Sequence, residues 1–137
     1  MKILIKLLSL GCDVNVKDFA GFTPLHHCCT KSGNQVTLKM AKRLLRAGAK
    51  VDAPNRLGET PLFSISQTPH YDAISLLLEH GANPYKQDNC GFSAFSNARI
   101  NPKMNQLFGK YYKKRVKEHL KVNCCIKKNC NMNLSCV

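Results

Sequence analysis

The residues of this chain that could do chemistry gather in two places. Positions 26 to 29 read His-His-Cys-Cys, and four further cysteines, Cys124, Cys125, Cys130 and Cys136, crowd the C-terminal end. Imidazole and thiolate groups are the usual ligands of structural zinc, and a cysteine that contacts a histidine can act as a nucleophile. Whether either cluster does so depends on its spacing and on the elements that hold it.

The C-terminal cluster has an irregular spacing. Structural zinc sites usually contain cysteine pairs separated by two to four residues. Here Cys124 and Cys125 are adjacent, four residues separate Cys125 from Cys130, and five separate Cys130 from Cys136. Because the segment also lacks periodic apolar residues, we expect residues 123–137 to form a disordered Cys- and Asn-rich tail, with zinc binding by these four cysteines as the alternative.

The composition is that of one folded domain without a membrane span. Of the 137 residues, 44% are hydrophobic and 21% are charged, and Lys6 and Gly11 interrupt the most apolar stretch, well short of the ~18 residues of a spanning helix. The eight cysteines are unevenly placed, which favours reduced thiols and an intracellular location, cytoplasmic or nuclear. We expect no cofactor and no catalysis, because the acidic residues are scattered and neither a phosphate-binding loop nor a Ser-His-Asp set is present.

The positive charge is concentrated near the C-terminus. The net charge is +13, and residues 99–128 contain ten Lys or Arg against one acidic residue, Glu118. Asn101 followed by Pro102 is a typical helix start, so we expect a helix from there to about Val122. Its basic patch comprises Lys110, Lys113, Lys114, Arg115, Lys117 and Lys121. We interpret the patch as a solvated face of a capping helix, with binding to nucleic acid or an anionic membrane as the alternative.

An internal repeat of 33 to 37 residues organises the rest of the chain. Three lines superimpose: "LLSLGCDVNVKDFAGFTPLH", "LLRAGAKVDAPNRLGETPLF" and "LLEHGANPYKQDNCGFSAFS". Two series of glycines keep the same phase, and these are Gly11, Gly48 and Gly81, then Gly21, Gly58 and Gly91. The first series suits the left-handed residue that ends a helix, and the second suits a tight turn. The Thr-Pro pairs at 23–24 and 60–61 predict helix starts.

These motifs resemble the ankyrin repeat. "GFTPLHHCC" and "GETPLFSIS" are similar to the family's G-x-T-P-L-H line, and "LLLEHGANP" is similar to its L-L-L-x-x-G-A line, over roughly residues 3–115. The resemblance implies an all-α solenoid of stacked helix-turn-helix units with projecting β-hairpin-like fingers. It also implies a protein–protein interaction module, a scaffold or adaptor, whose partner is a protein of unknown identity. One unit cannot bury its apolar face alone, so neighbouring units must stack.

The repeat phase predicts the organisation of the chain. The expected units are the second half of an incomplete repeat at 1–18, a repeat with an inter-helix insertion at 19–52, a repeat at 53–85, a divergent repeat with the basic helix at 86–122, and the tail at 123–137. Residues 1–12 form either a bare half-repeat or part of a longer array. We favour the longer array, because an uncovered apolar face invites aggregation.

The repeat changes the interpretation of the His-His-Cys-Cys stretch. His26 takes the family's histidine position, which implies a structural hydrogen-bonding role, and Cys28 and Cys29 replace two small alanines. Adjacent cysteines on a helix point about 100° apart, so they do not easily meet one metal. Only His26 and Cys29 share a face, and two ligands make a poor zinc site. We therefore expect packing here, with no metal.

The resemblance also implies where a partner binds, namely at the finger tips and on the concave face of the first helices. The residues expected there are Lys17, Phe19, Phe22, His27, Arg56, Leu57, Glu59, Ser64, Asn89, Phe92 and Asn97. Asn15 stands where asparagines of this family can be hydroxylated by a cytosolic asparaginyl hydroxylase, whereas Asp52 and Tyr85 stand there in the later units.

Overall fold

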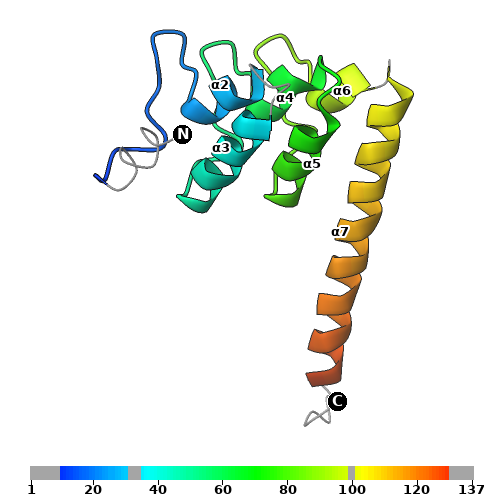
Figure 1. The fold of residues 1–137 in the computed structure, drawn as a ribbon. Helices are drawn as coiled ribbons and strands as arrows, with labels where there is room; N and C mark the ends of the chain where they lie inside the picture. The colour runs from blue at the N-terminus through cyan, green and yellow to red at the C-terminus, as the bar shows by residue number, and fades with distance from the viewer. Residues whose placement is uncertain (1–9, 31–34, 99–100, 130–137) are drawn as a thin grey trace.

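The computed structural model describes residues 10–30, 35–98 and 101–129, and it describes side chains within these ranges except at Thr30, Gln35, Val36 and residues 119–129. Figure 1 shows pairs of helices standing side by side, with loops that all project at one end and a long helix, α7 (Pro102–Asn129), in the last pair. The described residues thus confirm the expected all-α solenoid. The projecting fingers are loops. Among the described residues, one isolated antiparallel β-bridge joins Gln87 and Ser93.

Three pairs of helices form the stack. The first pair is α2 (Pro24–Thr30) and α3 (Gln35–Arg46), the second is α4 (Pro61–Ser66) and α5 (Tyr71–Glu79), and the third is α6 (Ala94–Ala98) and α7 (Pro102–Asn129). The shorter helices α2, α4 and α6 pack in one row, and α3, α5 and α7 pack in a second row. Residues 1–9 of the expected half-repeat and residues 31–34 of the segment expected to hold the insertion lie outside the described residues.

Side chains at the N-cap position, just before the helix, stabilise the start of the short helices α4 and α6. Thr60 accepts a hydrogen bond from the backbone N–H of Phe63 at 3.2 Å, and Pro61 opens α4, as expected for a Thr-Pro start. α6 lacks this motif, yet Ser93 and Ser96 each accept a hydrogen bond from the other's backbone N–H, at 3.2 and 2.9 Å. This reciprocal cap satisfies N–H groups that would otherwise lack a partner.

A glycine follows the end of each of the helices α3 and α5. Gly48 and Gly81 have φ angles of 91° and 89°, a backbone conformation that costs a residue with a side chain about 1 kcal/mol or more. The amide N–H of the following residue, Ala49 or Ala82, donates back to Leu44 or Leu77 at 3.0 Å, which closes the helix end and turns the chain toward the next finger.

The last helix is longer than the sequence predicts. No Gly or Pro occurs between Lys110 and Asn129, and α7 continues to Asn129 without a stop. The expected end near Val122 is therefore wrong, and residues 123–129 are helical and not part of a disordered tail. Residues 130–137 lie outside the described part of the chain.

The core runs between the two rows of helices. Its fully buried side chains include Leu25, Leu44, Leu62, Ile65, Ile74, Leu77, Leu78 and Met104. On the terminal helix, Met104 and Phe108 face this core, while Lys103, Asn105, Gln106 and Lys110 are exposed. A polar outer face of this kind closes a stack of repeats. No described helix is both long and apolar enough to cross a membrane.

Candidate protein-binding surface

Each finger is closed by the side chain at its first position. In the first finger, the Asp18 carboxylate accepts hydrogen bonds from the backbone N–H groups of Ala20 and Phe22, at 3.0 and 2.8 Å. The Asp18 carbonyl accepts from the N–H of Gly21 at 2.9 Å. These bonds join the Asp18 side chain to backbone groups of the finger. The side chains of the tip residues are therefore not needed to form the turn.

The other two fingers repeat this arrangement. Asn55 accepts from the backbone N–H groups of Leu57 and Glu59 at 2.9 Å each. Asp88 accepts from those of Cys90 and Phe92, at 2.9 and 2.8 Å. The turn geometry that the glycine phase predicts is therefore present three times, and it places equivalent residues in a row.

Neighbouring fingers lie edge to edge. The backbone N–H of Arg56 donates to the carbonyl of Ala20 at 3.1 Å, and that of Asn89 donates to the carbonyl of Leu57 at 2.9 Å. A Cβ atom on Gly21 would lie 2.7 Å from the Arg56 nitrogen, and one on Gly58 would lie 2.9 Å from the Asn89 nitrogen. Glycine is thus needed at these two positions both for its positive φ and for this close approach.

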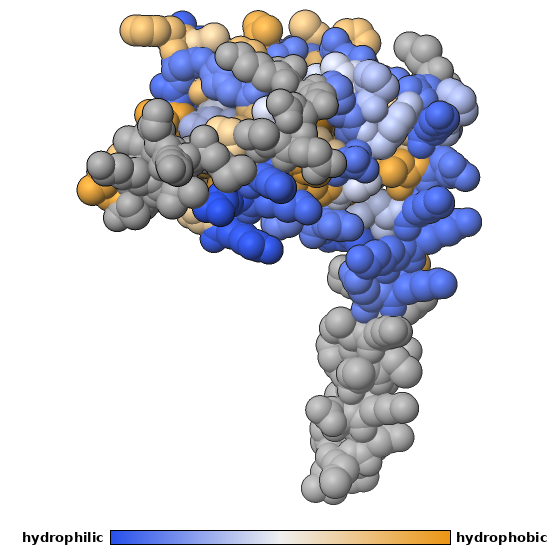
Figure 2. Space-filling view, viewed as in Figure 1, coloured by the Kyte–Doolittle hydropathy of each residue, from blue (hydrophilic) through white to orange (hydrophobic). Residues whose placement is uncertain are grey.

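The finger tips expose large apolar side chains. Phe19 at the first tip is 94% exposed and Leu57 at the second is 62% exposed, and Phe92, which follows the turn glycine of the third finger, is 57% exposed. Arg56 and Asn89 are exposed beside them. Figure 2 shows apolar residues along the upper edge of the molecule, where the fingers of Figure 1 project. Aromatic and aliphatic anchors with polar neighbours are the composition of a protein interface.

Four of the expected contact residues are half-buried, and their side chains make contacts within their own unit or, for Asn97, with the preceding one. The Glu59 carboxylate accepts from the Asn55 amide at 2.7 Å, and the Ser64 hydroxyl donates to the Thr60 carbonyl at 3.3 Å. The Asn97 amide donates to the Ser66 hydroxyl of the preceding unit at 3.2 Å. The ring of Phe22 packs on two histidines. Because these four side chains are partly covered, the exposed candidate surface lies mainly at the finger tips.

His27 borders this surface. Its Nε2 atom lies 2.8 Å from Oδ2 of Asp18, and both side chains are about half-exposed. The hydrogen bond from the Phe22 N–H, assisted by His27 and the Ala20 N–H against the opposing effect of burial, holds the pKa of Asp18 below its usual value. The carboxylate is therefore ionised at neutral pH, and His27 is oriented over the ring of Phe22, whose centroid lies 5.6 Å away.

His26 is a buried structural residue. Its Nδ1 accepts from the backbone N–H of Thr23 at 3.1 Å, and its Nε2 lies 3.1 Å from the Glu59 carbonyl of the next unit. Because a carbonyl only accepts, the proton sits on Nε2. Burial, partly offset by the Glu59 carbonyl, lowers the pKa of His26, so a neutral imidazole bridges the two units.

The neighbouring cysteines pack in the core. Burial raises the pKa of Cys28, and burial together with Cys28 raises the pKa of Cys29 to about 12. A neutral thiol is a poor nucleophile and a poor metal ligand. Among the described residues, no three potential ligands come together. The four C-terminal cysteines are outside this comparison: the side chains of Cys124 and Cys125 are not described, and Cys130 and Cys136 lie beyond the described residues.

Polar bonds between units are a feature that sequence reasoning missed. The Asn15 amide oxygen accepts from the Lys50 N–H at 2.7 Å and its nitrogen donates to the Gly48 carbonyl at 3.4 Å. One unit later, the Asp52 carboxylate accepts from the Asn83 N–H at 3.1 Å. Asn15 and Asp52 are separated by 37 residues, the same step as the first two glycines of each series, and this spacing could have indicated equivalent roles. Hydroxylation of Asn15 stays a prediction.

The basic helix carries a second surface. Lys110, Lys113, Lys114, Arg115 and Lys117 are exposed on α7, while the side chain of Lys121 is not described. Together with the segment Gly81–Tyr85, the helix lines a groove of about 400 Å³. Sequence reasoning did not find this groove, because its two walls are more than twenty residues apart in the chain.

Comparisons with known proteins agree with this geometry. The family described as ankyrin repeats (3 copies) matches residues 1–88. The SMC5-SMC6 complex localization factor protein 1 of Homo sapiens is 44% identical over 80 residues, which cover 57% of this chain and 7% of that protein. The ADP-ribosylation factor GTPase-activating protein AGD4 of Arabidopsis thaliana is 52% identical over 48 residues, 35% of this chain and 6% of that protein.

A viral relative matches over a larger share. The putative ankyrin repeat protein R664 of Acanthamoeba polyphaga mimivirus is 32% identical over 90 residues, which cover 63% of this chain and 54% of that protein. The chain thus spans a small part of the first two relatives and about half of the third.

Proposed function

Because the chain belongs to the ankyrin-repeat family, we propose that it is a non-catalytic scaffold or adaptor that binds a protein partner through its finger tips. Ankyrin repeats are protein–protein interaction modules, and the described residues form such a stack. The matched segment is only 7% of the localization factor, so we take from this relative the class of partner, a protein, and not its identity.

The row of exposed apolar tips carries the proposal. Phe19 and Leu57 occupy neighbouring fingers, yet the turn bonds of both fingers come from Asp18 and Asn55. A side chain that is 94% exposed contributes little to folding. Exposed apolar groups in a row on a firm support therefore serve best as anchors for another molecule.

The stiffness of the fingers supports binding. Each finger is bonded within itself and to its neighbour by backbone hydrogen bonds. A surface that is already ordered loses little conformational entropy when a partner binds, so more of the interaction free energy appears as affinity.

The test compares partner recovery between matched variants. Phe19→Ala combined with Leu57→Arg removes two tip anchors, and Lys42→Ala combined with Arg46→Ala changes two exposed residues of α3, away from the fingers. We expect quantitative mass spectrometry of affinity-purified complexes to show proteins lost at least tenfold from the tip variant and retained by the α3 variant. Equal recovery by both variants would contradict the proposal.

The exposed cations of α7 support a second candidate, in which this helix binds nucleic acid or an anionic membrane and the repeats position it. Electrostatic binding of this kind weakens steeply with salt. Fluorescence anisotropy with duplex DNA, and cosedimentation with anionic vesicles, at two salt concentrations would show it. Absence of binding at low salt excludes this candidate.

A further inference from the structure

α7 leaves the stack where α5 ends. Met104, Phe108, Tyr111 and Arg115 follow at intervals of four, three and four residues, so they lie on one face of the helix. Along this face the side chains pass from buried Met104 and Phe108, through half-buried Tyr111, to exposed Arg115. The face that packs against the stack thus continues past it and becomes basic.

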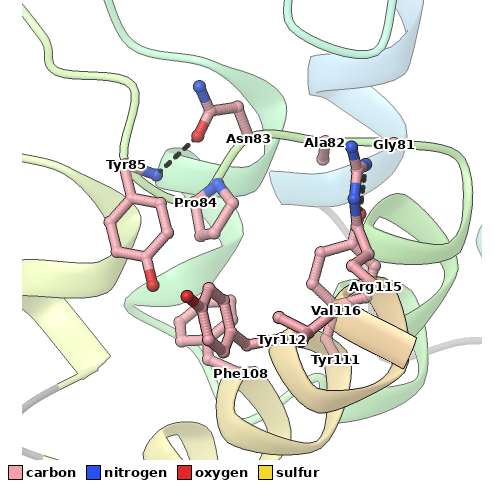
Figure 3. Close-up of a pocket in the computed structure, with 10 residues that line it drawn as sticks. All are labelled: Gly81, Ala82, Asn83, Pro84, Tyr85, Phe108, Tyr111, Tyr112, Arg115 and Val116. Carbon is pink, nitrogen blue, oxygen red and sulfur yellow. Dashed lines mark hydrogen bonds between the residues drawn. The ribbon is translucent and has the colours of Figure 1, made fainter. Parts of the chain in front are cut away.

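The groove described above opens at this point. Its walls are the segment Gly81–Tyr85 and the α7 residues Phe108, Tyr111, Tyr112, Arg115 and Val116. Figure 3 shows these side chains arranged around an open space, with those of α7 facing the segment. Tyr112 is 60% exposed and Val116 is 39% exposed. The groove therefore offers an apolar surface large enough for one or two side chains of another molecule.

Contacts inside the protein hold the walls in place. The Tyr85 ring packs on Phe95 with centroids 5.0 Å apart, and Phe95 lies 6.3 Å from Phe108. The Arg115 guanidinium donates to the Tyr111 hydroxyl at 3.1 Å and lies 5.9 Å from the centre of its ring. A preformed groove of this kind needs little rearrangement to receive a ligand.

Positive charge predominates on the α7 wall of the groove, while the Asp52 carboxylate contacts Asn83 on the opposite wall. From Pro102 to Glu118, α7 contains six Lys or Arg and a single acid, Glu118. Arg115 lines the groove itself. Lys113 is exposed and lies three residues, about one helical turn, before the lining residue Val116. Charge complementarity at a rim favours a negatively charged ligand and speeds its association.

We propose that this groove binds an acidic peptide, with one aromatic or long aliphatic side chain seated against Tyr112, Val116 and Pro84 and carboxylates near Arg115 and Lys113. The shape favours a peptide over a nucleic acid or a membrane. The exposed rings of Tyr85 and Tyr112 lie on opposite walls of the groove and do not form one stacking platform. Phe108 and Tyr111 are packed into the protein, and a concave groove gives a flat bilayer little contact. The proposal is independent of the finger tips.

The test uses the full chain and a random dodecapeptide library displayed on phage. We expect selection to enrich peptides that combine net negative charge with an aromatic or long aliphatic residue. In fluorescence anisotropy, the best synthetic peptide should bind Arg115→Glu at least ~10-fold more weakly and Tyr112→Ser about 5-fold more weakly. Lys103→Glu, the same change of charge elsewhere on α7, should alter the Kd less than ~2-fold.

Controls separate the outcomes. All three substituted residues are exposed, so circular dichroism should show unchanged folding, and Phe19→Ala combined with Leu57→Arg should bind the peptide normally. Selection without acidic enrichment would overturn the proposal, as would equal binding by Arg115→Glu. It would also fail if a twelve-nucleotide oligothymidine, or phosphatidylcholine vesicles with phosphatidylserine, bound more tightly than the peptide and lost affinity with Arg115→Glu.

Discussion

The repeat stack and the outer part of α7 are both helical, but the helices of the stack are short and the last helix continues beyond it. In the stack, α3 and α5 are followed by Gly48 and Gly81, and the chain turns back into the next finger. α7 meets no such glycine and continues to Asn129. Helix length in this molecule is therefore set by the stop signal, while the neighbouring unit decides which side chains are covered.

The two regions also differ in what their polar groups do. In the stack, Asn15, Asp52 and Asn97 bond the adjacent unit. On α7, the described side chains from Tyr112 to Glu118 are exposed. Polar residues in the first region maintain the shape of the molecule, whereas those in the second face the solvent.

A proline placed in each region should give the largest contrast. Ser75→Pro removes a backbone bond inside α5, which packs against α3, α4 and α7, and should lower the free energy of unfolding by at least ~3 kcal/mol. Lys113→Pro interrupts α7 beyond the stack and should change that free energy by less than ~0.5 kcal/mol, although helix content falls. Urea unfolding followed by circular dichroism measures both. Equal destabilisation would show that the outer part of α7 contributes as much to folding as α5 does.

Alanine at the turn glycines sharpens the comparison inside the stack. Gly58 and Gly91 have φ angles of 80° and 84°, so both substitutions introduce about 1 kcal/mol of backbone strain. Only at Gly58 would the new Cβ meet backbone, 2.9 Å from the Asn89 nitrogen. We expect Gly58→Ala to cost about 2–3 kcal/mol in total and Gly91→Ala about 1 kcal/mol. Similar losses in thermal unfolding would show that finger stacking does not contribute.

A stabilising change is expected at Asp52. Burial raises the pKa of this carboxyl, and the Asn83 N–H and Lys86 offset the effect only in part. Asn15, at the equivalent place, both accepts from and donates to the next unit. Asp52→Asn should therefore raise the free energy of unfolding by about 0.5–1 kcal/mol at neutral pH, through one added hydrogen bond.

The pH dependence tests the cause of this gain. A folded pKa above the unfolded value means that the contribution of Asp52 to stability is complete at low pH and is lost as the pH rises through the folded pKa. The gain from Asp52→Asn should thus be smaller at about pH 3 than at neutral pH. Asn15→Asp, the reverse exchange, should destabilise the protein at neutral pH, and a stabilising effect would refute the explanation.

The smallest effect is expected at Asp18, whose bonds lie within one finger. Its pKa is lowered mainly by the Phe22 N–H, so its contribution to stability is present above the unfolded pKa and disappears as the pH falls through the folded value. Asp18→Asn keeps the acceptor, as Asn55 does naturally, but removes the titration. The melting temperature of the variant should fall slightly less on acidification than that of the wild type. A parallel fall would contradict the assignment.

Much of the fold follows from the sequence because its signals are local. The two glycine series, the Thr-Pro pairs and the first residues of the fingers each act within five residues, and all three fingers form as predicted. The end of α7 was mispredicted because the Asn- and Cys-rich composition after Val122 outweighed a second local signal, the absence of any helix breaker.

The features that sequence reasoning missed depend on distant partners. Asn97 looked available for a ligand, but its amide bonds Ser66, 31 residues away. Ser96 takes a capping role that the missing Thr-Pro motif gave no reason to expect. The groove lies between the segment that follows α5 and one face of α7, and the proximity of these two walls is visible only in the folded structure.

The closed fingers have a consequence for how this surface can change. The residues between the first position and the glycine are Phe-Ala, Arg-Leu and Asn-Cys in the three fingers, yet the turn bonds are the same in all three. Asn89 differs from the other tip residues, because its amide donates to the Arg56 carbonyl of the neighbouring finger at 3.0 Å. Substitutions at the other positions can accumulate without endangering the fold, so natural selection or a protein engineer can alter specificity one finger at a time.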